Sequence, residues 1–306
     1  MEQKVINMEE WKEQNLDYVV RGTAMNDEIR VFAATTRNLV QKAHELHHTA
    51  ALPTAALGRT LTAGIMMGSM LKGDRDLLTI IMKGNGPLGG VTVTADSHGH
   101  VKGFVYNTDA VLPPKSKGHL DVGGGFGKGT LTVVRDLGLK EPYSSTINLV
   151  SGEIAEDLTY YFAESEQVPS SVGLGVLVGT DQNVRQAGGF IIQLMLDCSE
   201  EAEQKLEANL RKIKSVTQML EEGMTPEQML AHIMPDMELE IMEKTSAEFR
   251  CDCSRERVSG ALMTVGKKEM QDMISEQKPV ELQCHFCGKK YVFTVGELQQ
   301  MLDSME

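Results

Sequence analysis

Four cysteines near the C-terminal end of the chain have the residue type and spacing of a metal site. Cys251 and Cys253 form a C-x-C pair, and Cys284 and Cys287 form a C-x-x-C pair thirty residues further on. Two close pairs are a common way to present four thiolates to one tetrahedral ion, and four sulfur ligands favour Zn²⁺. Because four thiolates leave no open coordination position, we expect a zinc ion that is not a catalytic Lewis acid. The fifth cysteine, Cys198, lies far upstream, and no role is predicted for it.

These four cysteines are compatible with two uses of the metal. The spacing alone favours a permanent zinc ribbon, which would serve as a passive interaction module. The alternative is a redox switch, because each cysteine has another within two or three positions that can turn an oxidised thiol into a disulfide. Oxidation would remove the ligands, release zinc and withdraw the folding free energy that the metal supplies. We expect the charges of neighbouring Arg255, Arg257, Lys289 and Lys290 to offset those of the thiolates.

The composition indicates where these thiols act. The chain has 306 residues, enough for two or three domains, with 30 Lys and Arg against 43 Asp and Glu and a formal net charge of -13. Such an acidic chain is not expected to bind nucleic acid, which needs a basic surface to replace phosphate counterions. No membrane partner or secretory signal is expected, because long apolar runs are missing and the opening segment MEQKVINMEEWKEQ has no apolar core. We therefore expect a cytoplasmic protein, in which paired cysteines indicate metal or redox chemistry.

The elements that must position the site follow from the apolar pattern. Residues 1–196 are predicted to be an α+β domain with helices packed on a mixed or antiparallel sheet, because short strands are separated by Gly, Asn and Asp turns. The expected strands are Asp17–Met25, Glu28–Thr35, Leu77–Lys83, Gly90–Ala95, Val101–Tyr106, Gly129–Arg135, Ser145–Val150, Val172–Val178 and Gly188–Leu196. Helices are expected over residues 37–48, from Thr54 to Lys72 and from Ser151 to Glu166, with a loop over residues 111–130.

An amphipathic helical linker is predicted over residues 197–235. One charged helix is expected over Ser199–Glu222, with a single apolar stripe, and Gly223 would end it. Thr225 would begin a second helix through a capping box with Gln228. Because a short amphipathic helix is marginal alone, its stripe must lie on another part of the protein. Both a permanently packed helical hairpin and a conditionally docked linker satisfy this requirement.

A small C-terminal zinc-binding domain is predicted over residues 236–306. Two helices, from Ser254 and from Lys267, and a hairpin of two strands should surround the cysteines, and Thr294 with Glu297 should cap a last helix. A unit of about 70 residues has a marginal apolar core, so a bound metal would contribute to its folding.

Three other motifs lack a required part. Gly84–Gly89 matches G-x-G-x-x-G but leads into a strand, which indicates a hairpin turn and not a nucleotide site. Gly123–Thr130 has too few residues between its glycines for a P-loop, and Gly replaces the expected Ser or Thr. His44, Glu45 and His48 fit the H-E-x-x-H pattern of zinc peptidases, without an identifiable third ligand. A solvated helix end is the simpler interpretation, and a zinc metallopeptidase is the alternative function.

Five longer sequence motifs resemble those of a known protein family. Two contain the cysteines: Cys251-Asp-Cys-Ser-Arg-Glu-Arg257 and Cys284-His-Phe-Cys-Gly-Lys-Lys-Tyr-Val-Phe293. Three lie upstream: Pro53-Thr-Ala-Ala-Leu-Gly-Arg59, Tyr161-Phe-Ala-Glu-Ser-Glu-Gln-Val-Pro169 and Ala187-Gly-Gly-Phe-Ile-Ile-Gln193. Together they make the chain resemble the redox-regulated 33-kDa heat-shock chaperone family of bacteria (heat shock protein 33).

The resemblance implies an ATP-independent holdase and not an enzyme, inactive when reduced and bound to one zinc ion. Peroxide or hypochlorous acid, with mild unfolding, would form one disulfide between Cys251 and Cys253 and another between Cys284 and Cys287. Zinc would leave, the linker would loosen, and the protein would bind unfolding clients as a homodimer during oxidative and heat stress. Methionine suits surfaces that bind many partners, and we expect the client surface to include Met219, Met224, Met229, Met234 and Met237.

Overall fold

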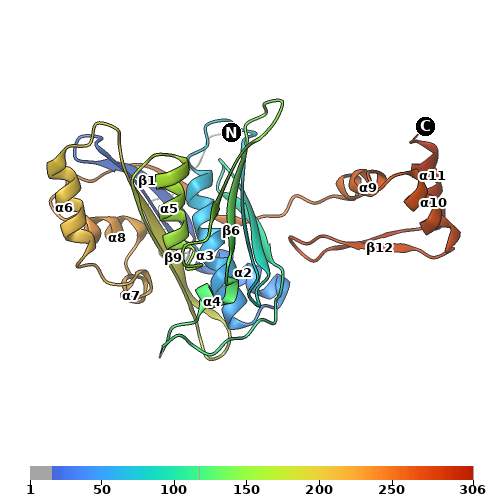
Figure 1. The fold of residues 1–306 in the computed structure, drawn as a ribbon, viewed down its shortest axis with the longest axis horizontal. Coiled ribbons are helices and arrows are strands. Elements are labelled where there is room, and N and C mark those ends of the chain that lie inside the picture. The colour runs from blue at the N-terminus through green and yellow to red at the C-terminus, as the bar shows by residue number, and fades with distance from the viewer. Residues whose placement is uncertain (1–15, 117, 306) are drawn as a thin grey trace. The chain divides into compact units, whose positions relative to one another are not determined.

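The computed structural model describes residues 16–116 and 118–305 (Figure 1). By their contacts these residues form two compact units, with the boundary between Phe249 and Arg250. The opening segment MEQKVINMEEWKEQ, in which no secretory signal is expected, lies outside the described residues. Within the described ranges, no helix is both long enough and apolar enough to cross a membrane. The elements below confirm the predicted α+β class.

One layer of the first unit is an antiparallel sheet of five strands in the order β10-β1-β2-β9-β8. Its strands are β1 (Tyr18–Ala24), β2 (Ile29–Thr35), β8 (Ser170–Val178), β9 (Val184–Leu194) and β10 (Glu240–Ser246). Both faces of this sheet are covered, because Val19 and Phe32 join one apolar cluster while Val20 and Val31 join another. Since successive side chains of a strand point to opposite faces, burial on both sides explains the nearly continuous apolar runs of β2 and β9.

The second layer is a sheet of six strands in the order β11-β5-β4-β3-β6-β7. Its strands are β3 (Leu77–Gly84), β4 (Gly90–Asp96), β5 (His100–Val105), β6 (Gly129–Asp136), β7 (Tyr143–Asn148) and β11 (Glu248–Phe249). All neighbours are antiparallel except β11, which runs parallel to β5. The stretch from Gly84 to Gly89 is the turn between β3 and β4, which confirms the hairpin interpretation of the G-x-G-x-x-G match.

Helix α3 (Ala51–Gly68) packs against both sheets and is buried on nearly every side (Figure 1). Helices α2 (Arg37–His47) and α5 (Ala155–Ser165) add to the same apolar cluster, and α4 (Val122–Phe126) is a short helix inside the expected loop. Helix α3 begins three residues before the predicted Thr54. Pro53 therefore sits inside its first turn, where a missing backbone N–H costs no helical hydrogen bond.

Three linker helices cover the face of the five-stranded sheet opposite α3 (Figure 1). They are α6 (Glu200–Leu210), α7 (Val216–Glu221) and α8 (Pro226–Ile233). The prediction of one helix over Ser199–Glu222 is wrong, because Ser215 starts a new helix. Its hydroxyl accepts the Gln218 N–H and the Gln218 side chain accepts the Ser215 N–H. The predicted capping box of Thr225 and Gln228 is confirmed.

The segment between the linker helices and the cysteines also belongs to the first unit. Strand β10 pairs with β1, and β11 pairs with β5, so this stretch completes both sheets. The expected boundary at residue 236 therefore precedes strands that belong to the first unit. Strand β10 was not predicted, because Glu240–Ser246 is charged, mostly exposed and without an alternating apolar pattern.

The second unit, Arg250–Glu306, is small. It contains α9 (Arg255–Met263), α10 (Lys267–Ser275), the hairpin of β12 (Val280–Gln283) and β13 (Lys290–Phe293), and α11 (Val295–Asp303). The capping box of Thr294 and Glu297 is confirmed. The buried apolar side chains among its described residues are Leu262, Met270, Tyr291, Phe293 and Leu298. So small a core is marginal by itself, because little apolar surface leaves water on folding.

Candidate metal centre

Two short segments of the second unit carry the four cysteines. Cys251 and Cys253 lie in the irregular stretch between β11 and α9, just before Ser254, whose hydroxyl caps α9. Cys284 and Cys287 lie in the turn that joins β12 to β13. The Cys284 N–H donates to the Lys289 carbonyl at 2.9 Å, and the Gly288 N–H donates to the Cys284 carbonyl at 2.8 Å. Gly288 has a φ of 72°, a conformation that glycine adopts without steric cost, so the turn folds back tightly.

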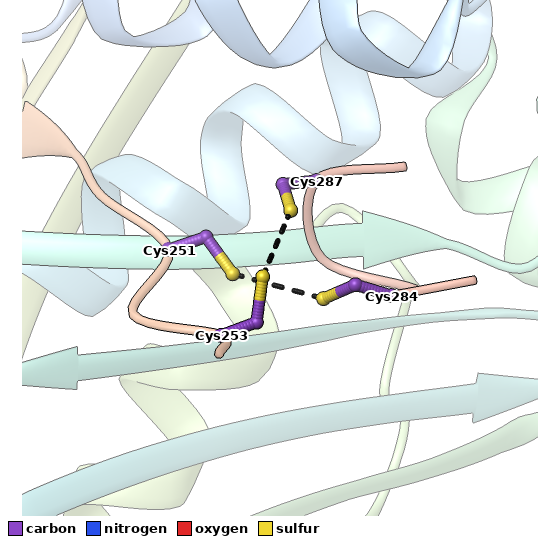
Figure 2. A group of neighbouring side chains, drawn as sticks. All are labelled: Cys251, Cys253, Cys284 and Cys287. Atoms are coloured by element: carbon purple, nitrogen blue, oxygen red, sulfur yellow. Dashed lines mark hydrogen bonds between the residues drawn. The ribbon is translucent and has the colours of Figure 1, made fainter. Parts of the chain in front are cut away.

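The four sulfur atoms converge. Figure 2 shows the side chains of Cys251, Cys253, Cys284 and Cys287 pointing toward one another from the two segments. All four Sγ atoms lie within 4.8 Å of one another, with Cys251 3.7 Å from Cys284 and Cys253 3.4 Å from Cys287. Sulfurs bound to one tetrahedral zinc ion, at about 2.3 Å each, lie about 3.8 Å apart, whereas a disulfide bond measures about 2.05 Å. The spacing therefore fits four thiol ligands of one metal ion and not two disulfides.

Tyr291 supplies a hydrogen bond to this sulfur cluster. Its hydroxyl donates to Cys253 Sγ at 3.1 Å, and its ring is buried in the core of the second unit. Burial acts to raise the pKa of Cys253, but the bonds from Tyr291 and the neighbouring thiols outweigh it and lower the pKa to about 7. Burial raises the pKa of Cys251 and of Cys287. Tyr291 therefore favours the thiolate form of one ligand.

The cations expected to offset the thiolate charge have other partners. Arg255 bonds Glu297 at 2.7 Å and lies 4.4 Å from the centre of the Phe293 ring. Arg257 pairs with Asp252, and Lys290 with Glu281. Lys289 Nζ lies 5.2 Å from the centre of the Tyr291 ring. Three of the four cations therefore pair with carboxylates of the second unit, and Tyr291 is the side chain that donates a hydrogen bond to a cysteine sulfur. Sequence reasoning missed this role, because a tyrosine four residues after the second cysteine pair has no distinctive signal of its own.

The arrangement can hold one metal ion through four sulfur donors. Soft thiolates in tetrahedral spacing suit Zn²⁺, and no carboxylate or histidine takes part in the cluster. Cys198 is not a member of it. Its Sγ lies 3.6 Å from the Ser199 carbonyl oxygen, and burial with the charges of Glu28 and Glu203 raises its pKa. A thiol with a raised pKa is a poorer nucleophile at neutral pH.

Comparison with known proteins agrees with this geometry. The sequence model of the family described as "Hsp33 protein" matches residues 17–294. The chain belongs to the Hsp33 family. It is 55% identical over 285 residues to the "33 kDa chaperonin" of Agathobacter rectalis, covering 93% of this chain and 99% of that protein. The "33 kDa chaperonin" of Clostridioides difficile is 50% identical over 290 residues, covering 94% and 99%.

A solved Hsp33 structure shares the fold. The crystal structure of the 33 kDa chaperonin (heat shock protein 33 homolog) from Thermotoga maritima superimposes with a TM-score of 0.87 at 37% identity. The match covers 94% of this chain and 98% of that one. The arrangement of sheets and helices described above is therefore that of an Hsp33 chaperone.

The H-E-x-x-H stretch does not form a metal site. His44 Nδ1 lies within hydrogen-bond distance of the Thr49 and Thr54 hydroxyls, at 3.3 and 3.2 Å. Helix α2 ends at His47, and His48 follows in a left-handed conformation with a φ of 51°. The i, i+4 geometry that two zinc-binding histidines need is therefore lost. Within the described ranges, only the four cysteines form a cluster of three or more potential metal ligands.

Proposed function

We propose that this Hsp33 chain is an ATP-independent holdase that is kept inactive by zinc bound to Cys251, Cys253, Cys284 and Cys287, and is activated by oxidation of these thiols. The observation that carries the proposal is the convergence of four Sγ atoms at tetrahedral spacing in a unit whose described residues include five buried apolar side chains. When bound there, zinc would cross-link two segments of the chain and so supply folding free energy. A site that supports folding through oxidisable ligands couples the redox state to the fold.

The oxidation step follows ordinary thiol chemistry. One peroxide molecule oxidises one thiolate to a sulfenic acid and leaves as water or hydroxide. The thiol of a second cysteine attacks that sulfur, forms the S–S bond and releases another water. Two peroxides thus convert four thiols into two disulfides, for which we propose Cys251 with Cys253 and Cys284 with Cys287. No thiolate then remains to hold the metal.

Chain connectivity gives this change a route to the linker helices. Cys251 lies two residues after the end of β11, and β10 and α8 come immediately before β11 in the chain. Strand β10 lies at the edge of its sheet, where it has one neighbouring strand, β1. Edge strands and terminal segments open more readily than central ones. We infer that loss of order at the cysteines frees β11 and β10 first and then α8.

The face that such opening would expose suits binding to unfolded protein. Met219, Met229, Met234 and Met237 are each at most 2% exposed, and Met224 packs against the same cluster. Flexible methionine side chains adapt to varied apolar partners. We propose that this surface binds unfolding clients, that the oxidised protein acts as a homodimer, and that it works in the cytoplasm, where reducing conditions keep the switch off until stress.

Zinc release and client protection, measured on the same samples, test the proposal. Reduced, zinc-loaded protein is treated with peroxide at raised temperature while a chromogenic chelator reports zinc and a thiol reagent counts free cysteines. We expect about one zinc ion to be lost per four thiols, and the treated protein to suppress aggregation of a denatured client without ATP. The Cys198→Ser variant is the control and should behave identically. Zinc retained with intact thiols would instead indicate a permanent ribbon.

A further inference from the structure

A cavity of about 290 Å³ lies inside the first unit, where helices α3 and α5 end. Strands β2 and β9 form one side, and the end of β6 forms another. The four cysteines contribute nothing to it, and neither do the linker helices. Its lining combines a wall of apolar side chains with several charged groups, which is the composition of a small-molecule site.

A buried polar network fixes one charged group in this cavity. Arg30 Nε and Nη2 both donate to Gln193 Oε1, at 3.2 and 2.6 Å. Gln193 is 1% exposed, and its amide nitrogen donates to the Ser170 hydroxyl at 3.1 Å. That hydroxyl donates in turn to the Val168 carbonyl at 2.9 Å. The network orients the guanidinium, but every oxygen in it is neutral.

Within the part of the chain that the structure describes, Arg30 forms no direct ion pair with a carboxylate. Its Nη1 makes no hydrogen bond to the described residues, and its nearest ring contact is the face of Phe32 at 5.6 Å. Burial and the like charges of Arg21 and Arg135 lower the pKa of Arg30 and outweigh the charge of Glu166, which acts to raise it. A partly buried, unpaired guanidinium is costly unless an anion joins it.

The carboxylates of the cavity do not fill that role. Glu166 is engaged by Arg135 at 2.8 Å and by the Tyr161 hydroxyl at 2.5 Å. Asp76 accepts the Gly73 N–H at 2.9 Å. With Lys72 also on the wall, the cavity has one more cation than carboxylates. The excess charge is positive.

The carbonyl ends of the helices do not cancel this charge. The last turn of α3 has its carbonyl groups bonded by backbone N–H groups of Ser69, Met70 and Leu71. In α5 the Phe162 carbonyl accepts the Val168 N–H at 3.0 Å. Because these groups are paired within the chain, their partial negative charge at the cavity is reduced.

We propose that this cavity binds a small monocarboxylate with an apolar tail, its carboxylate on Arg30 and its tail against the apolar wall. That wall consists of Met67, Met70, Leu71, Leu137, Phe162 and Val168. A planar guanidinium matches a carboxylate well, and the cavity volume accommodates one short chain and no larger ligand. A free aliphatic acid and the C-terminal residue of a polypeptide share this chemistry.

Calorimetric titration of the reduced, zinc-loaded full chain tests the proposal. Octanoate is the probe for a free acid, and N-acetyl-leucine is the probe for a C-terminal residue; octanol and N-acetyl-leucinamide are their uncharged counterparts. We expect one-site binding of at least one acid, with Arg30→Gln weakening it about 10- to 100-fold. Arg185→Gln is the matched control, because Arg185 is an exposed residue of β9 about 26 Å along the strand from Gln193.

A second variant keeps the test decisive if Arg30→Gln fails to fold. Leu137 lies at the exposed mouth of the cavity, and Leu137→Trp should block binding while leaving the buried network intact. Binding of octanoate alone identifies a free acid as the ligand, and binding of N-acetyl-leucine alone identifies a chain terminus. Absence of saturable binding of both acids at millimolar concentrations would overturn the proposal. The proposal would also be overturned if the uncharged counterparts bound as tightly as the acids. It would equally be overturned if neither Arg30→Gln nor Leu137→Trp weakened binding of the acids.

Discussion

The hydroxyl of Tyr18 on β1 donates a 2.8 Å hydrogen bond to the carboxylate of Glu227 in the first turn of α8, 209 residues later in the chain. Lys244 on β10 forms an ion pair with the same carboxylate, and its Nζ lies 5.5 Å from the centre of the Tyr18 ring. Glu227 thus ties the last linker helix to two strands of the sheet beneath it. Burial acts to raise the pKa of Glu227, but the bonds from Lys244 and Tyr18 outweigh it and hold the pKa below its ordinary value.

Replacing Glu227 with Gln should loosen α8 and lower the free energy of unfolding by about 1–3 kcal/mol near neutral pH, because a charged hydrogen-bond acceptor is lost. A lowered pKa in the fold means that the carboxylate stabilises the protein above its unfolded-state pKa of about 4.3 and loses this effect as the pH falls through the folded-state pKa. The difference between the variant and the wild type should therefore shrink in acid.

Denaturant unfolding over a pH series, with hydrogen exchange of α8 peptides, measures this effect. Glu222→Gln is a matched control, since Glu222 pairs with Lys214 at the surface, where ion pairs contribute little. If Glu222→Gln and Glu227→Gln lower the free energy of unfolding equally, the contact of Glu227 with Tyr18 does not stabilise the docking of α8.

Replacing Tyr291 with Phe should weaken zinc binding about 10- to 100-fold, the usual effect of removing a hydrogen bond to a metal ligand. The phenyl ring keeps the apolar contacts of the core, so folding of the zinc-loaded protein should change little. Competition with a chelator of known affinity measures the change. Tyr143→Phe, at an exposed position in the first unit, should leave zinc affinity unaltered. Wild-type affinity in Tyr291→Phe would show that the 3.1 Å contact with Cys253 does not support the metal.

Disulfide mapping should distinguish two pairings. The proposed disulfides join Cys251 with Cys253 and Cys284 with Cys287, whereas the short contacts described above join Cys251 with Cys284 and Cys253 with Cys287. All four atoms lie within 4.8 Å, so loss of order after the first oxidation decides the outcome in favour of neighbours in sequence. Mass spectrometry of peptides from peroxide-treated protein reports the pairing. A majority of bonds between the two cysteine pairs would show that oxidation precedes unfolding of this unit.

Chelation of zinc from the reduced protein should unfold residues 250–306 and leave most of the first unit folded. Five buried apolar side chains form the core of the described part of the second unit, while the first unit has two large apolar clusters of its own. Hydrogen exchange should show rapid exchange in α9, α10 and α11 and protection in α3. Restoring zinc should reverse the change. Retained protection in α11 without zinc would mean that the metal does not support this fold.

Shortening a buried linker methionine should lower the oxidant dose that activates the chaperone. Met229 is fully buried between α8 and the sheet, and Met229→Ala should weaken docking by about 2–5 kcal/mol through a cavity and lost contacts. Client protection is measured against peroxide dose. Met242→Ala, at a 63% exposed position of β10, is the control and should keep the wild-type dose response. If Met229→Ala keeps the wild-type dose response, the strength of linker docking does not control activation.

Features that depend on near neighbours in the chain could be predicted from the sequence. The capping boxes at Thr225 and Thr294 formed as expected, because each joins residues three positions apart. The α+β class followed from turn residues between apolar runs. The four cysteines stood out because two close pairs of thiols in one short stretch are typical of a metal or redox site. Local signals also failed in places, as at Ser215, where a capping box divided a continuous amphipathic pattern into two helices.

Contacts between distant segments were decided only by the tertiary structure. The bond from Tyr291 to Cys253 and the network of Arg30, Gln193 and Ser170 each join residues from separate elements. Strand β10 has no strong pattern of its own and is a strand because the edge of β1 offers it hydrogen bonds. The sequence alone determined which residues could hold a metal ion, since the chemistry and spacing of the cysteines belong to the chain itself. Which side chains support those residues depends on packing, because the free energy of burial comes from partners that the chain meets only once it is folded.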